Sequence, residues 1–174
     1  FSIGGTTGFS WKSISPINSV GRSRPAAAVV NRHIYLFGGE IPPSGGRADT
    51  VERYDPSTNT WTTLPGVMPA PASNICAAVI GTDIYIPGGY SASSTYLNTL
   101  RVFHTSTNSW SVITTDPLPV GLSGTACAVL NNKLYAIGGV NSNVAQASAY
   151  VYDPMAAAGS RWSTIASLNT ADAY

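Results

Sequence analysis

HIYLFGG at residues 33–39 and VERYDPSTNTW at residues 51–61 are the two segments of this sequence that predict its fold, because both recur along the chain. Their glycine pair, aromatic residue and tryptophan return at nearly constant intervals. The glycine pairs are 50 residues apart, the aromatic residues 49, and the tryptophans 50, 49 and 52, counted from Trp11. The residues in phase are Gly38, Gly39, Tyr54 and Trp61, then Gly88, Gly89, Phe103 and Trp110, then Gly138, Gly139, Tyr152 and Trp162. The chain therefore contains three complete internal repeats.

Each repeat has the pattern of four short β-strands. Runs of β-branched and aromatic residues are bounded by Gly, Pro, Asn and Asp, which is typical of strands joined by hairpins. The predicted strands are 26–30, 33–37, 50–54 and 60–64 in the first repeat, 76–80, 83–87, 100–103 and 109–113 in the second, and 126–130, 133–137, 149–152 and 161–165 in the third. No window has a convincing helical period, so the sequence predicts an all-β fold.

Strands that end in Gly-Gly, followed by Tyr-Asp-Pro and then Trp, resemble the repeats of the Kelch β-propeller family. The period fits Kelch repeats better than the shorter WD40 repeats. The resemblance implies that each repeat is one blade, with its first strand innermost and its tryptophan strand outermost. Residues 26–30, 76–80 and 126–130 would then line a central channel. We interpret the motif residues as scaffold, because glycine allows close backbone approach and the aromatic side chains supply buried area between blades.

The repeats divide the chain into three blades and a remainder at the N-terminus. We expect a partial blade with an outer strand around Trp11 at 1–22, and complete blades at 23–72, 73–122 and 123–174. Known propellers have about four to eight blades. Three blades therefore make an incomplete propeller with two open apolar flanks, and such surfaces promote association. We expect either a homodimer that forms a six-bladed ring or closure by the missing blades of a longer chain, and we favour the dimer.

Strand polarity places two sets of loops on one face of the predicted propeller. They are 40–49, 90–98 and 140–147, which follow the glycine pairs, and 16–25, 65–74 and 117–125, which precede the innermost strands. Loops on a rigid scaffold commonly carry function, and the Kelch resemblance implies binding at this face. Arginine can bind a carboxylate, while tyrosine and asparagine can bind sugars or peptide amides. The candidate ligand-binding residues are Arg22, Arg24, Arg47, Asn74, Tyr90, Tyr96, Asn141 and Asn143.

The composition disfavours several classes of partner. The net charge is +1, which gives no field to attract nucleic acid or an acidic membrane surface. No stretch approaches the roughly 18 apolar residues of a membrane helix. Charged residues make up only 10% of the chain, and its loops are rich in small polar residues, which favours a secreted or cell-surface protein.

The cysteines and histidines indicate no cofactor and no metal. Cys76 and Cys127 are expected on neighbouring innermost strands one position apart, so their side chains should point to opposite faces, and we expect buried thiols rather than a disulfide. His33 and His104 are expected in turns, His104 in place of a turn aspartate, without other ligands at metal spacing. This set also lacks the paired His and Tyr ligands of the copper radical oxidases that share the propeller.

Two functions of different classes follow from the sequence. The first is a non-catalytic binding or interaction module that uses the loop face for a protein or glycan ligand. The alternative is a sugar-handling enzyme that resembles the Kelch-fold sialic acid mutarotase, with Arg and Glu side chains around a bound sugar. A cluster of Arg24, Arg47 and Glu40 around one pocket would favour the enzyme. A third reading is an assembly fragment without a ligand.

Overall fold

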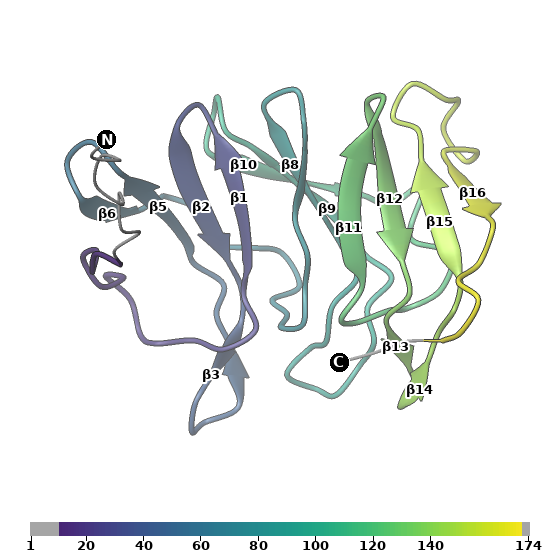
Figure 1. Cartoon of the computed structure of the whole chain (residues 1–174), viewed down its shortest axis with the longest axis horizontal. Helices are drawn as coiled ribbons and strands as arrows, with labels where there is room; N and C mark the ends of the chain where they lie inside the picture. The colour runs from purple at the N-terminus through teal and green to yellow at the C-terminus, as the bar shows by residue number, and fades with distance from the viewer. Residues whose placement is uncertain (1–10, 172–174) are drawn as a thin grey trace, which may run out of the picture.

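The computed structural model describes residues 11–171, and every regular element in this range is a β-strand (Figure 1). Each repeat forms one antiparallel sheet of four strands, and we name these sheets blades 1, 2 and 3. Blade 1 contains β1 (Ala26–Val30), β2 (His33–Phe37), β5 (Val51–Asp55) and β6 (Thr60–Thr63). Blade 2 contains β7 (Ala78–Ile80), β8 (Asp83–Pro87), β9 (Leu100–His104) and β10 (Ser109–Ile113). Blade 3 contains β11 (Ala126–Leu130), β12 (Lys133–Ile137), β15 (Ala149–Tyr152) and β16 (Trp162–Ile165).

In each blade the chain runs as a meander from the innermost to the outermost strand. The sheet orders are β1-β2-β5-β6, β7-β8-β9-β10 and β11-β12-β15-β16. The innermost strand β7 contacts both β1 and β11, so the three inner strands lie next to one another. Small side chains such as Ala26, Ala28 and Ala78 are buried there, where the blades crowd together. The prediction of an all-β, incomplete propeller is confirmed.

The expected strands agree closely with those of the structure. Seven of the twelve have the predicted bounds: β1, β2, β8, β10, β11, β12 and β15. Four others differ by one residue at one or both ends, and β7 begins at Ala78 rather than at residue 76. The expected outer strand around Trp11 lies partly outside the described residues, and residues 11–22 contain no strand. No helix within residues 11–171 has the length and apolar character needed to cross a membrane.

Two short hairpins extend from the loops that follow the glycine pairs, and the sequence did not predict them. One joins β3 (Glu40–Ile41) to β4 (Gly46–Arg47), and the other joins β13 (Val140–Asn141) to β14 (Val144–Ala145). Figure 1 shows both on the same side of the molecule. They carry several of the candidate binding residues away from the sheets.

In blades 1 and 2, the first glycine of the pair is needed for a close approach to the next blade. Gly38 and Gly88 have φ angles of 57° and 62°, which favour glycine. A Cβ on Gly38 would also collide with the backbone oxygen of Ala72, and one on Gly88 with that of Leu122. Both oxygens belong to the linker that enters the next blade, so these glycines let neighbouring blades pack directly against each other.

Aromatic side chains form a repeated pair within each blade and fill the space between blades. The ring centroids lie 5.1 Å apart for Tyr54 and Trp61, 5.0 Å for Phe103 and Trp110, and 5.1 Å for Tyr152 and Trp162. Between blades 1 and 2, Phe37 packs edge-on against Phe103 and Trp110. The core therefore consists of layers between sheets, as the repeat pattern indicates.

In each blade, a basic side chain on one strand faces an aspartate on the neighbouring strand. These pairs lie at the end of the sheet away from the short hairpins. The pairs are His33–Asp55 at 3.8 Å, Asp83–His104 at 3.0 Å and Lys133–Asp153 at 2.9 Å. The order of the two residues is reversed in blade 2. His104 therefore stands where the other blades have aspartate because Asp83 supplies the carboxylate from the other strand.

Substitutions at Asp83 and His104 test whether the two residues stabilise blade 2 as a pair. His104→Asp should lower the free energy of unfolding by about 1 kcal/mol, because two carboxylates then face each other across the strands. The double variant Asp83→Lys/His104→Asp copies the pair of blade 3 and should regain most of that loss. Urea unfolding at pH 7 measures both values. A double variant no more stable than the single one would show that the pair does not interact.

Cys76 and Cys127 form a disulfide, with their Cα atoms 5.7 Å apart, so the expectation of buried thiols is wrong. Residues at odd and even positions of a strand point to opposite faces of its sheet. Where two blades face each other, however, one contributes its even positions and the other its odd positions. Ala26 and Ala28 of β1 pack toward blade 2, whereas Cys127 and Val129 of β11 pack back toward it. Cys76 occupies the phase of Ala26, so its side chain points forward to meet Cys127.

Candidate functional site

Two loops of each blade meet on one face of the molecule, which we call the rim. In every blade the linker before the innermost strand forms a single antiparallel bridge with the loop after the second strand. The bridges are Ser23–Glu40, Ser73–Tyr90 and Ser123–Val140. The structure thus places the two predicted sets of loops together, and an equivalent serine makes the contact in each blade.

A hollow of about 720 Å³ opens at the rim between the three blades. Six of the eight candidate binding residues line it: Arg24, Arg47, Asn74, Tyr90, Tyr96 and Asn143. Because these residues come from different repeats, only the convergence of the blades brings them together. We call this cavity the rim hollow.

Blade 1 supplies the charged wall of the rim hollow. Glu40 lies 3.2 Å from Arg24 and 4.0 Å from Arg47, measured between carboxylate oxygen and guanidinium nitrogen. Most hydrogen-bonding groups of Arg47 are already occupied by the protein. It donates to the backbone oxygens of Gly45 and Tyr90, and its side chain is only 8% exposed. Within residues 11–171, Glu40 is the only side chain paired with Arg24, and the Arg24 side chain is 62% exposed, so its remaining donors face solvent.

Blades 2 and 3 supply an aromatic and amide wall. The rings of Tyr90 and Tyr96 pack edge-to-face with centroids 5.0 Å apart, and the guanidinium of Arg47 lies 5.7 Å from the centre of the Tyr90 ring. The Tyr96 hydroxyl donates to the side-chain oxygen of Asn143 at 2.8 Å and accepts from its backbone N–H at 3.1 Å. These contacts fix both tyrosines before any ligand arrives.

Seven residues outside the candidate set also line the rim hollow: Pro25, Glu40, Ile75, Ser123, Gly124, Thr125 and Val140. The sequence repeat indicates one of these residues, Gly124. Arg24, Asn74 and Gly124 occupy equivalent positions in successive blades, so the repeat that indicates Arg24 and Asn74 also indicates Gly124. Thr125 is 7% exposed, and within the described residues its hydroxyl has no hydrogen-bond partner.

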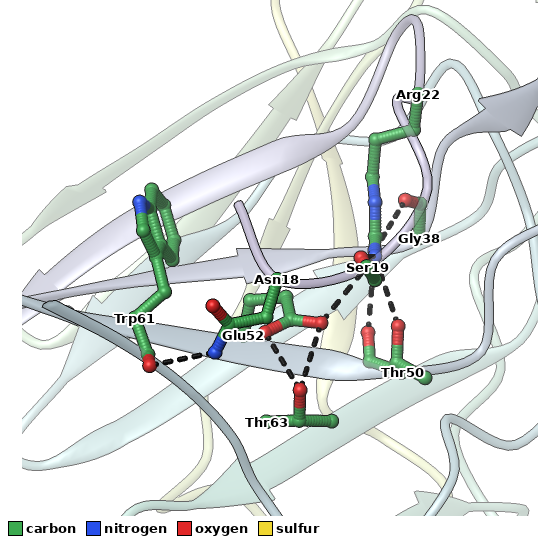
Figure 2. Close-up of polar contacts among 8 residues, drawn as sticks. All are labelled: Asn18, Ser19, Arg22, Gly38, Thr50, Glu52, Trp61 and Thr63. Carbon is green, nitrogen blue, oxygen red and sulfur yellow. Dashed lines mark hydrogen bonds and ion pairs between the residues drawn. The ribbon is translucent and has the colours of Figure 1, made fainter. Parts of the chain in front are cut away.

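Arg22 does not line the rim hollow, because its side chain is buried in blade 1 (Figure 2). It donates to the backbone oxygens of Gly38 and Thr50 at 3.2 and 3.4 Å and to the Thr50 hydroxyl at 2.9 Å. Its guanidinium lies 3.8 Å from Glu52, and the two side chains are 1% and 0% exposed. Burial lowers the pKa of Arg22, while Glu52 opposes that effect. Arg22 acts here as a scaffold residue.

Asn141 also serves the scaffold, since its side-chain amide donates to the backbone oxygen of Gly121 at 2.6 Å. The contact joins the β13–β14 hairpin to the linker that enters blade 3. Asn141 is absent from the lining of the rim hollow. The candidate site thus narrows to the six residues that converge there.

The described lining of the rim hollow combines charged, aromatic and polar groups. Within the described part of the chain, no three His, Cys, Asp or Glu side chains lie close enough together to hold a metal ion. Its described lining presents the exposed Arg24 guanidinium paired with Glu40, two packed aromatic rings, and amide and hydroxyl groups. Such a mixture suits hydrogen bonding and stacking with a polar ligand.

The chain matches a Kelch-repeat family profile and is similar to a Kelch-like protein and to a sugar epimerase. The sequence profile described as "KLHDC2/KLHL20/DRC7 Kelch-repeats domain" matches residues 6–172. The chain is similar to Kelch-like protein 15 of Gallus gallus, with 35% identity over 130 residues, covering 73% of this chain and 26% of that protein. It is also similar to N-acetylneuraminate epimerase of Haemophilus influenzae, with 36% identity over 86 residues, covering 48% of this chain and 23% of the enzyme.

A solved structure has the same fold. The structure of YjhT superposes with a TM-score of 0.77 at 19% identity, covering 94% of this chain and 57% of that one. The likeness concerns the fold alone, because the identity is low. This chain therefore spans about a quarter of the length of the relatives named above and little more than half of the superposed structure.

Proposed function

Because the chain belongs to the Kelch-repeat family, we propose that it is a non-catalytic binding module whose rim hollow receives a protein loop or a glycan. The observation that carries this proposal is the convergence of six candidate residues from separate repeats on one hollow of about 720 Å³. Cavities of this size are typical of ligand sites that combine apolar walls with a few placed polar groups.

The state of the lining groups supports a site built in advance. Tyr90, Tyr96 and Arg47 are held by contacts with the protein, so a ligand need not order them and binding costs less conformational entropy. Arg24 and the hydroxyl of Thr125 still have hydrogen-bonding capacity. A ligand with carboxylate, hydroxyl or amide groups would match these donors.

A glycan and peptide array, followed by titration of any ligand found, tests the proposal. Arg24→Ala should weaken binding at least about tenfold, the effect of losing one hydrogen bond to a charged group. Arg32→Ala is the matched control, since Arg32 is exposed in the turn between β1 and β2, away from the rim. Equal affinities for the two variants would place the ligand outside the rim hollow.

We also propose that the binding module works in a closed propeller. The additional blades come either from a second copy of the chain or from the remainder of a longer protein. The open sides of blades 1 and 3 support closure, because they expose Val29 and Leu130 to 63% and 60%. The Cys76–Cys127 disulfide supports a secreted or cell-surface location, because such bonds persist mainly in oxidising compartments.

A sugar-handling enzyme is the second candidate, and one observation favours it. Arg24, Glu40 and Arg47 form a single ion-pair cluster at the wall of the rim hollow. A carboxylate between two guanidinium groups could bind a sugar and exchange protons with its hydroxyl groups. The similarity to N-acetylneuraminate epimerase covers only 48% of the chain, so it supports this candidate less than the cluster does.

Proton NMR distinguishes the two functions. An enzyme should accelerate the interconversion of the anomers of N-acetylneuraminate, and Glu40→Gln should abolish the acceleration. Binding without acceleration in the intact protein would leave only the binding module. An acceleration that survives Glu40→Gln would exclude this carboxylate as the proton-transfer group.

A further inference from the structure

The disulfide between Cys76 and Cys127 lies beside the rim hollow. Cys76 directly follows Ile75, and Cys127 comes two residues after Thr125. Both Ile75 and Thr125 line the hollow, one from the chain that enters the innermost strand of blade 2 and the other from the chain that enters that of blade 3. The bond therefore ties together two segments of chain that form neighbouring parts of the lining.

The disulfide constrains one junction between blades and leaves the other unconstrained. The loop that it closes runs from residue 76 to residue 127, and it contains all strands of blade 2 and the linker that enters blade 3. The strands of blade 1, within residues 26–63, lie outside this loop. In repeat proteins, a terminal repeat can open while its neighbours stay folded. Blade 1 can therefore separate from blade 2 with the bond intact, whereas blade 3 cannot.

The linked junction also has less apolar packing among residues 11–171. The cluster between blades 1 and 2 contains thirteen buried side chains, whereas the two clusters at the junction of blades 2 and 3 contain four and three. The rings of Phe37 and Phe103 lie 5.5 Å apart across the first junction, and those of Tyr85 and Tyr152 lie 6.0 Å apart across the second. Because less apolar surface holds blades 2 and 3 together, their junction depends more on the covalent link.

Equivalent backbone hydrogen bonds cross both junctions at the rim. The amides of Asn74 and Gly39 donate across the first junction at 3.1 and 2.9 Å. The amides of Gly124 and Gly89 donate across the second, each at 2.7 Å. The repeat therefore supplies matched reporters, with one junction inside the closed loop and the other outside it.

The rim hollow keeps its shape only while the second junction is closed. Tyr96 of blade 2 donates to the side-chain oxygen of Asn143 of blade 3 at 2.8 Å and accepts from its backbone N–H at 3.1 Å. Both residues line the hollow, so these two bonds cross the junction within the lining. Separation of blades 2 and 3 breaks both bonds, and Tyr96 then loses its fixed position.

We propose that the Cys76–Cys127 disulfide is a redox-sensitive lock that holds the rim hollow in its binding form. This inference rests on the proposed binding function and adds a means of regulating that same site. A dithiol reductant opens the lock, since one of its thiolates attacks a cysteine sulfur and its second thiol resolves the mixed disulfide. Two electrons and two protons pass to the protein, which gains two thiols, while the reductant becomes a disulfide. Both cysteines are half-buried rather than fully covered, so a reductant can reach them.

Amide hydrogen exchange of the intact chain, followed by NMR, tests the lock without a ligand. Reduction with dithiothreitol should lower the protection of the Gly124, Gly89 and Asn143 amides at least about tenfold, because the second junction then opens more readily. The Asn74 and Gly39 amides should change less than about threefold, since blade 1 lies outside the closed loop. Equal losses at the two junctions, or unchanged protection at Gly124 and Asn143, would overturn the inference.

Moving the link to the first junction provides the matched control. The repeat equivalents of Cys76 and Cys127 at that junction are Ala26 and Ala77, which pack in one apolar cluster. With both native cysteines replaced by alanine, the double substitution Ala26→Cys/Ala77→Cys should form a disulfide between blades 1 and 2. Its reduction should then lower protection at the first junction and not at the second. A transplanted pair that stays reduced, or that still affects the second junction, would refute the equivalence on which the lock rests.

The lock and the binding proposal can fail separately. A glycan or peptide from the array that binds the oxidised and the reduced protein equally would leave the binding module standing and refute the lock. The expected exchange pattern together with an array that yields no ligand would support the redox-sensitive junction and count against the binding module.

Discussion

Replacing Cys76 and Cys127 together by alanine should lower the free energy of unfolding by about 4 kcal/mol. The disulfide closes a loop with a sequence separation of 51, and the chain-entropy model gives roughly that value for a loop of this length. Alanine is the residue that the repeat itself uses at these positions, since Ala26 and Ala126 are equivalent to Cys76, and Ala27 to Cys127. The double variant therefore removes the covalent link with little change in shape.

Urea unfolding of the oxidised protein, the reduced protein and the alanine variant measures this effect. The reduced protein and the variant should have similar stabilities, both well below that of the oxidised protein. Single Cys→Ala variants control for the side chain, and each should also lose the covalent contribution. A difference below about 1 kcal/mol between oxidised and reduced protein would mean that the link does not constrain the unfolded chain.

The repeat explains why so much of the fold could be predicted from the sequence. Gly38, Tyr54 and Trp61 each recur in phase, and each has one local role that does not depend on distant details. The glycine allows a close blade contact, and the aromatic pair fills the space beside it. The same repeat also predicts the strand bounds to within one residue, except for β7. There Cys76 is bonded to Cys127 of blade 3, and β7 begins two residues later, at Ala78.

The disulfide and the rim hollow depend on contacts between blades, which the pattern within one repeat does not reveal. The alternation along a strand indicates which of its side chains share a sheet face, and the same alternation also decides which residues of facing blades meet. Cys76 and Cys127 are such a pair. The sequence predicts Arg22 as a loop residue, and nothing in its own segment indicates that its side chain is buried beside Glu52 of β5.

Glu52→Gln should lower the free energy of unfolding by about 3 kcal/mol, because it removes the carboxylate paired with the buried Arg22 and leaves only the weaker interaction with Asp49. Both side chains are at most 1% exposed, so water cannot solvate the arginine in place of the lost carboxylate. The hydroxyl of Thr63, which donates to Glu52 at 3.0 and 3.2 Å, would also face an amide instead of a carboxylate. Figure 2 shows these groups in one network between the linker and blade 1.

Blade 3 provides the control, because it has apolar or aromatic residues at the same two positions, Leu122 for Arg22 and Tyr150 for Glu52. These two side chains pack in one apolar cluster there. The double variant Arg22→Leu/Glu52→Tyr should therefore be more stable than Glu52→Gln, since no charge remains buried and the new side chains can pack together. Urea unfolding of the wild-type protein, Glu52→Gln and the double variant measures the three free energies of unfolding. If the double variant loses more than Glu52→Gln, the network stabilises blade 1 through its hydrogen bonds to the Gly38 and Thr50 oxygens rather than through its balance of charge.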